Sequence, residues 1–342
     1  MQSQWQLPAG EYNLDLGFNI NWFNLGFDSA ALGNKAAYLQ SQFDSVVPTE
    51  QSNFSLQLRP KVSLTLGNAL FDFGFNLYTN NYKSDLLGNE FKPYFFPEVL
   101  VQYPFVEDVL SVFAGVKGRL RQNSYRNLTD DNPYVQPAFV SKPTRTTDIF
   151  LGVEGIFSAT TTFNLKGGYL IWKDRPLYYR DPAYRSNYFL DSLRNIPSLG
   201  TVYDNVESFY ARGELSFNIN NNLQAVAFAE LRSYNTKNEA EAWHMPNFFA
   251  SINLDYTFRE KLKLGTDWNY VGPREAFLQE DNPQLSSTLP AYLDVALNFE
   301  YLYNSRLSGF LTVSNLLNQK YDLYLGYKAQ RINFLMGFAY KF

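Results

Sequence analysis

Long runs in which apolar and polar side chains alternate constrain the fold of this chain more than any other feature of its sequence. In the first run, every second residue from Tyr12 to Trp22 is large and apolar, and the residues between them are Asn, Asp or Gly. Successive side chains of a β-strand point to opposite faces, so the run predicts a strand with one apolar face and one polar face. Such a run is long for a soluble strand and matches the roughly 9 to 11 tilted residues that cross a bilayer.

The same alternation recurs along the chain and predicts fourteen strands. The two-residue link Gly67-Asn68 is typical of a tight hairpin. An even number of strands is also what single-chain bacterial outer-membrane barrels have. The predicted strands lie near residues 11–23, 53–66, 69–79, 94–106, 109–121, 146–157, 161–172, 206–219, 223–234, 247–257, 262–271, 289–301, 306–315 and 330–342.

Short and long links alternate between these strands. The links at 106–108 and 220–222 are short, whereas those at 122–145 and 173–205 are long. Short periplasmic turns and long extracellular loops are typical of outer-membrane proteins. We therefore predict an all-β chain that forms a transmembrane antiparallel up-and-down β-barrel of about 14 strands, with residues 1–342 as a single domain.

A soluble sandwich or propeller is the alternative for so many strands. Its strands would be shorter, and its turns would recur every 8 to 12 residues or so. Aromatic residues make up 18% of the chain and fall mostly on the apolar faces, where lipid can contact all of them without a second protein layer.

The first residues lack the pattern of a signal peptide, and we expect that Met1 replaces one.

The C-terminal segment carries two patterns of known families. Alternating apolar residues, including Phe338 and Tyr340, end in Phe342 and resemble the assembly signal of bacterial outer-membrane proteins. Upstream, Val-Ser-Asn-Leu-Leu-Asn-Gln-Lys-Tyr at 313–321, followed by Arg331, resembles the end of TonB-dependent receptors. The resemblance covers about the last 50 residues and implies a barrel in the bacterial outer membrane, inserted by the barrel-assembly machinery. The plug domain and energy-coupling box of that family are not found in this sequence.

Charged residues on the polar face are the main functional candidates, because this face should line the lumen. The group on predicted strands two to five is mostly basic, with Asp72 and Glu98 as exceptions, and the group on strands ten to twelve is mostly acidic. Opposed across a lumen, such groups would create the transverse field of a porin constriction. Alternatively, the charges pair with neighbours, because an unpaired charge in a narrow tube is costly. The predicted pore-lining residues are Arg59, Lys61, Lys117, Arg119, Arg121, Asp255, Asp267 and Asp294.

Other chemistry has little support in the sequence. The chain has 0 Cys, and His244 is the only histidine, which we expect at the surface near the entrance of a strand. We expect no enzyme activity, no metal site and no cofactor. The net charge of −4 and the lack of a basic block argue against nucleic acid as a partner. The aromatic and basic loop at 178–189 either stacks on a sugar ring or an aromatic solute, or is an ordinary outer loop packed on itself or against lipopolysaccharide.

The leading functional prediction is an outer-membrane channel, or porin, for passive and potentially selective diffusion of small polar solutes. The alternative is a non-conducting barrel subunit, or a receptor-like accessory component, of an outer-membrane uptake, secretion or assembly complex. The expected partners are outer-membrane lipid and lipopolysaccharide, the barrel-assembly machinery and, in the alternative, a lipoprotein or periplasmic protein. A third class, an outer-membrane enzyme, would depend on His244 and is not expected.

Overall fold

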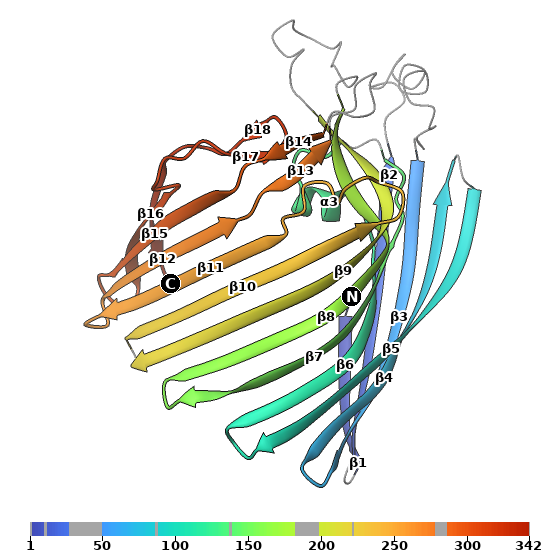
Figure 1. Cartoon of the computed structure of the whole chain (residues 1–342), viewed down its shortest axis with the longest axis horizontal. Coiled ribbons are helices and arrows are strands. Elements are labelled where there is room, and N and C mark those ends of the chain that lie inside the picture. Colours follow the sequence, from blue (N-terminus) through green and yellow to red (C-terminus); the bar gives the residue numbers. More distant parts are fainter. Residues whose placement is uncertain are drawn as a thin grey trace, which may run out of the picture.

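The described part of the chain forms one large antiparallel sheet with simple connectivity. In this computed structural model, fifteen strands of the described residues follow one another around the sheet, and each strand between the first and the last pairs with the strands before and after it. Figure 1 shows that the sheet is strongly curved. Within the described ranges, the first and last strands each have a single partner strand. The structure describes residues 2–9, 12–26, 50–85, 88–136, 139–181, 198–220, 222–277 and 286–341.

The sheet confirms the predicted fold class and contains all fourteen predicted strands. Gln2–Ala9 adds a strand that the sequence did not predict, and it pairs with Tyr12–Gly26 along its whole length. The strands of the sheet are β1 (Gln2–Ala9), β2 (Tyr12–Gly26), β3 (Glu50–Leu66), β4 (Ala69–Ser84), β5 (Gly88–Val106), β6 (Leu110–Arg121), β7 (Thr144–Ser158), β8 (Thr161–Asp181), β9 (Ser198–Asn220), β10 (Leu223–Thr236), β11 (Phe248–Phe258), β12 (Leu262–Val271), β15 (Tyr292–Leu302), β16 (Leu307–Ser314) and β19 (Asn333–Tyr340).

The long connections carry the remaining secondary structure. A short helix lies between β6 and β7, and two small hairpins lie between β12 and β15 and between β16 and β19. In Figure 1 the helix and both hairpins lie at the same end of the sheet. These elements are α3 (Tyr125–Asp131), β13 (Arg274–Phe277), β14 (Ser286–Leu289), β17 (Asp322–Tyr324) and β18 (Tyr327–Lys328).

Alternation along the strands separates an apolar outer face from a polar inner face. On β5, Phe95 is 63% exposed while the adjacent Phe96 is 7% exposed, and on β3 the buried Asn53 and Ser55 flank the exposed Phe54. Lipid can solvate such an apolar outer face, which is why it needs no second protein layer. No helix of the described residues is long and apolar enough to cross a membrane.

The connection from residue 122 to residue 143 folds against the inner face at the loop end of the sheet. Ser124 caps α3, since its Oγ accepts the N–H of Asn127 at 3.3 Å. Beyond the helix, Gln51 of β3 donates its side-chain amide to the carbonyl of Phe139 at 2.9 Å. The N–H of Gln136 donates to the carbonyl of Leu199 on β9 at 2.9 Å. This connection therefore contacts both β3 and β9, and it partly covers the inner face.

Candidate functional site

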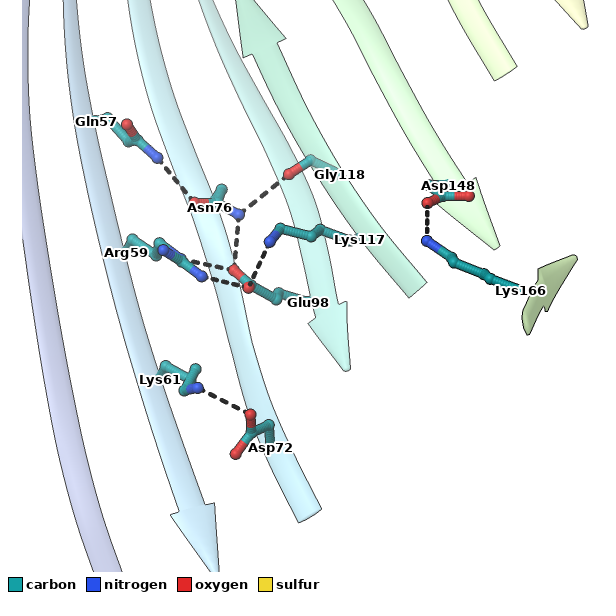
Figure 2. A network of polar contacts seen from close by, with 10 residues as sticks. All are labelled: Gln57, Arg59, Lys61, Asp72, Asn76, Glu98, Lys117, Gly118, Asp148 and Lys166. Atoms are coloured by element: carbon teal, nitrogen blue, oxygen red, sulfur yellow. Dashed lines mark hydrogen bonds and ion pairs between the residues drawn. The ribbon is translucent and has the colours of Figure 1, made fainter. Parts of the chain in front are cut away.

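The polar face of β3 to β6 carries a connected group of charges centred on Glu98 (Figure 2). The Nε atom of Arg59 donates to Glu98 at 2.7 Å, and a second guanidinium nitrogen forms an ion pair with the same carboxylate. Asn76 donates to Glu98 at 3.2 Å, and the Nζ atom of Lys117 lies 3.9 Å from it. Lys61 is paired separately, with Asp72 at 2.8 Å. The two acidic exceptions among the basic residues are thus their partners.

Gly74 explains how Arg59 reaches Glu98 across the intervening strand. The register places Gly74 opposite Lys61 on one side and opposite Glu98 on the other. A Cβ atom at Gly74 would lie 2.6 Å from the carbonyl oxygen of Pro60, so the backbones are too close there for any side chain. Because Gly74 has no side chain, the polar face of β4 is open at this position, and the side chains of Arg59 and Glu98 meet across it.

The other predicted pore-lining residues have varied surroundings. Arg121 pairs with Asp131 of α3 at 2.6 Å. Asp267 accepts amide hydrogen bonds from Asn253 at 2.6 Å and from Asn298 at 2.7 Å. Asp294 is hydrogen-bonded to Tyr321. Across the described ranges, neither Arg119 nor Asp255 forms an ion pair.

Pairing between neighbours is therefore present in the basic group, as the alternative interpretation of the charges expected. It holds for Arg59, Lys61, Lys117 and Arg121, and also for Glu230 with Arg232 at 2.5 Å. A further pair joins Lys166 to Asp148 at 2.8 Å (Figure 2). That these residues line a conducting pore stays a prediction.

A cavity of about 600 Å³ lies on the polar face, where β6, β8 and β10 meet the long connections. Its wall includes Trp172, which is 5% exposed, and the guanidinium carbon of Arg175 lies 4.3 Å from the centre of the indole ring. The guanidinium carbon of Arg232 lies 5.6 Å from the same ring centre. Arg119 and Arg121 also line the cavity, at the end of β6.

Residues from three separate connections meet beside this cavity. Tyr324 of β17 donates its hydroxyl to the carbonyl of Asp131 at 2.7 Å, a contact between residues far apart in sequence. Tyr134 stacks on Tyr327 with ring centres 3.7 Å apart. Arg274 of β13 donates from its two terminal nitrogens to the carbonyls of Asp322 and Leu323, at 2.7 and 2.8 Å. These contacts, together with those of His244 to Tyr178 and Leu325, form a cluster that we call the loop junction.

His244 lies within the loop junction, and the expectation of a surface position was wrong. It is 8% exposed, its Nδ1 is 3.0 Å from the carbonyl of Tyr178, and its Nε2 accepts the N–H of Leu325 at 3.2 Å. Burial lowers the pKa of His244 to about 4, and the nearby charge of Arg274 acts in the same direction. The imidazole is therefore neutral at pH 7, and its Nδ1–H donates a hydrogen bond to the carbonyl of Tyr178.

Of the residues around the cavity, Arg119 and Arg121 were predicted as pore-lining, and the others were not predicted as a site. Arg175 lies in the long link at 173–205, and the hydrogen bonds of His244 and Tyr324 join positions 66 to 193 residues apart in sequence. The one local signal is the spacing of Glu230 and Arg232, which puts both side chains on the same face of β10. Among the described residues, no group of His, Asp and Glu has the arrangement of a metal site.

The predicted assembly signal and outer loop lie partly outside the described residues. On β19, Phe338 is 86% exposed and Tyr340 is 56% exposed, on the same face of the strand. Phe342 lies outside the described residues, and so does the part of the loop at 178–189 that follows β8. The role of this strand in assembly stays a prediction.

Solved structures with a similar fold are outer-membrane receptors and transporters. The FrpB iron transporter from Neisseria meningitidis (F3-3 variant) matches with a TM-score of 0.67 and 14% identity, over 100% of this chain and 54% of that chain. The pyoverdine outer membrane receptor FpvA from Pseudomonas aeruginosa PAO1 matches with a TM-score of 0.64 and 14% identity, over 100% and 52%. The copper transporter OprC matches with a TM-score of 0.66 and 13% identity, over 100% and 55%.

The chain spans about half the length of these similar structures. No model of a known protein family matches it, and no curated protein sequence is significantly similar to it. The resemblance to TonB-dependent receptors, which the sequence carries in about its last 50 residues, extends at the level of fold to the whole chain. The chain thus has the fold of an outer-membrane β-barrel that resembles the barrels of TonB-dependent receptors.

Proposed function

We propose that this chain forms part of the wall of a transport barrel in the bacterial outer membrane, and that its solute contacts the cavity beside the loop junction. The observation that carries the proposal is a polar, partly enclosed cavity at the loop end of an otherwise lipid-compatible sheet. The similar folds of FpvA, a pyoverdine receptor, and FrpB, an iron transporter, support uptake as the class of function.

Receptor-like uptake fits this arrangement better than passive diffusion does. The connection at 122–143 folds over part of the inner face, and the loop junction fixes it to the hairpin β17–β18. The basic groups that would create a constriction field are largely neutralised by Glu98, Asp72 and Asp131. Diffusion of small polar solutes stays a prediction, and stepwise conductance of the full chain in a planar bilayer would support it.

Depletion of nutrients from the medium tests the transport proposal and does not require one solute to be chosen in advance. A strain without the gene and the same strain complemented with it are grown in a complex nutrient mixture at limiting concentrations. Mass spectrometry of the medium should show at least one solute that only the complemented cells remove quickly. Identical depletion of every solute by both strains would contradict transport.

Contacts with other macromolecules are further proposals. The exposed apolar face of β19 suits recognition by the barrel-assembly machinery, and the aromatic residues near strand ends suit lipid and lipopolysaccharide. A lipoprotein or periplasmic partner, as in a receptor-like complex, would be identified by co-purification from cross-linked outer membranes.

A further inference from the structure

We propose that the cavity beside the loop junction binds a small anion that carries two or more negative charges on oxygen atoms. This inference rests on the proposed transport function for the role of the anion as cargo, but the binding itself stands on the residues of the cavity. Three observations support it: the charge of the cavity wall, its unpartnered donors, and the contact of two arginines with one indole ring.

The charge of the cavity wall is opposite to the charge of the chain. The described residues that line the cavity include four arginines and two carboxylates, a net formal charge of +2, whereas the whole chain has a net charge of −4. Asp131 neutralises Arg121 and Glu230 neutralises Arg232. Arg119 and Arg175 have no carboxylate partner within the described ranges. Within the part of the chain that the structure describes, two positive charges of this partly enclosed cavity are thus left without a carboxylate partner.

Two buried donors beside the cavity also lack partners. The Nε atom of Arg175 and the hydroxyl of Tyr178 are both inaccessible to solvent and without a hydrogen-bond partner in the described part of the chain. Tyr178 is itself 7% exposed and lines the cavity. A buried donor without an acceptor costs roughly 1–3 kcal/mol, so such groups in a native protein call for an explanation. Both atoms are covered in this structure, so an anion in the cavity would supply the missing acceptors once these side chains turn toward it.

Two guanidinium groups contact the same aromatic ring. The guanidinium carbon of Arg175 lies 4.3 Å from the centre of the Trp172 ring, and that of Arg232 lies 5.6 Å from the same centre. The two positive charges are therefore close to each other. The ring stabilises each cation through its electron-rich face, but it does not remove the repulsion between them. The arrangement keeps the guanidinium groups fixed before a ligand arrives, which reduces the entropy cost of binding.

The chemistry of the donors selects the class of ligand. Guanidinium groups form planar paired hydrogen bonds with carboxylate and phosphate oxygens, and these charge-assisted bonds are stronger than neutral ones. The cavity volume of about 600 Å³ is within the usual range for small-molecule sites. Neutral solutes such as sugars would leave both uncompensated arginines unpaired.

Calorimetric titration of the full chain in detergent micelles tests the proposal, with sodium pyrophosphate and sodium succinate as probes and sorbitol as the uncharged control. All titrations use the same ionic strength, so that general screening does not differ between them. At least one anion should bind with a Kd below about 1 mM, while sorbitol gives no binding heat. Arg119→Gln should weaken that binding about tenfold, the loss expected for one charge-assisted hydrogen bond.

Arg212→Gln is the matched control for the variant. Arg212 is an exposed arginine of the polar face on β9 that does not line this cavity, and its replacement makes the same change in charge. Affinity should change less than about twofold in this control. Binding of pyrophosphate alone would assign a phosphate-type ligand, and binding of succinate alone a carboxylate-type ligand; either supports the proposal.

Two results would overturn the proposal. One is the absence of binding heat for both anions at concentrations up to about 10 mM, because the affinity would then be too weak for a specific small-molecule site. The other is equal weakening by Arg119→Gln and Arg212→Gln, which would show general attraction to the polar face. If nutrient depletion persists in either case, the anion site fails and the transport function stands. If the anion binds but no nutrient is depleted, the transport function fails.

Discussion

The carboxylate of Glu98 on β5 is hydrogen-bonded to the guanidinium of Arg59 on β3, although β4 lies between these two strands. Gly74 makes this contact possible, because it places no side chain on the polar face of β4 between them. The pair shows how the inner face of a membrane sheet compensates its charges across strands. Each charge that approaches a low-dielectric wall needs such compensation.

Loss of the Glu98 charge should destabilise the sheet. In Glu98→Gln, Arg59 and Lys117 lose their carboxylate, and we expect the free energy of unfolding to fall by about 1–3 kcal/mol, since Arg59 is partly exposed. Urea unfolding of the chain in micelles measures this change. The control is Glu90→Gln, which removes an exposed pair with Lys92 at 3.5 Å and should cost less than about 0.5 kcal/mol. Equal effects of the two variants would contradict this account of the pair.

Gly74 should not tolerate even a methyl group. In Gly74→Ala, the new Cβ would lie 2.6 Å from the carbonyl oxygen of Pro60, a backbone atom that cannot move without distorting β3. We expect a loss of about 1–3 kcal/mol in thermal or urea unfolding. Gly17→Ala serves as the control, because its nearest contact, Cβ of Arg59, lies at an ordinary 3.5 Å. A stable Gly74→Ala protein would show that the strands do not approach so closely.

The loop junction should weaken at acidic pH through His244. Its pKa is lowered to about 4 in the folded protein, against about 6.5 for an unfolded histidine. The unfolded or opened form therefore binds the proton more readily, so the stability from His244 is present above pH 6.5 and is lost as the pH falls toward 4. Hydrogen exchange of the β17–β18 peptide, corrected for intrinsic rates, should accelerate over this range.

His244→Gln separates this effect from general acid destabilisation. Glutamine has both a donor and an acceptor but does not titrate, so the change in exchange between pH 7 and pH 4.5 should largely disappear in the variant. An unchanged pH profile would mean that another group controls the junction. The same variant at pH 7 should retain most of the protection of the Leu325 amide, whose N–H donates to His244.

Arg274 should hold the hairpin β17–β18 in place. It is 6% exposed and donates to the carbonyls of Asp322 and Leu323, two contacts that Arg274→Met removes while keeping most of the apolar stem. We expect protection of the hairpin amides to fall by about tenfold or more, as for the loss of hydrogen bonds to a charged group. Arg306→Met, at the turn before β16, is the control and should leave the hairpin unaffected. Equal protection in both variants would contradict this role.

The alternation of apolar and polar residues predicted the fold, because within each strand of a membrane sheet successive residues face lipid and the interior in turn. Each strand can therefore be identified from its own residues. All fourteen predicted strands are present, whereas β1 was missed because Trp5 and Leu7 are the only large apolar residues among its eight. The helix α3 has a single buried residue, Leu128, so no periodic pattern marked it. Short elements within long links carry too few residues for periodicity to identify them.

The candidate site was largely beyond sequence reasoning. The charges of β3 to β6 were identified, and pairing of these charges with neighbours was one of two interpretations that the sequence left open. The specific pair of Arg59 with Glu98, across an intervening strand, was not predicted. The cavity depends instead on contacts between distant connections, such as Tyr324 with Asp131. The burial of His244 comes from Tyr178 and Leu325, neither of which is near it in sequence. Tertiary packing of loops has no local signal.

The central claim, that one face of the sheet contacts lipid and the other contacts water, is tested most directly by spin-label accessibility in reconstituted bilayers. The chain has 0 Cys, so single cysteines can be labelled at adjacent positions without background. Labels at Leu254→Cys and Val116→Cys should be reached preferentially by oxygen, which concentrates in lipid. Labels at Asp255→Cys and Lys117→Cys should be reached by a water-soluble nickel chelate. Equal accessibility of neighbouring positions, or the reverse order, would contradict the claim.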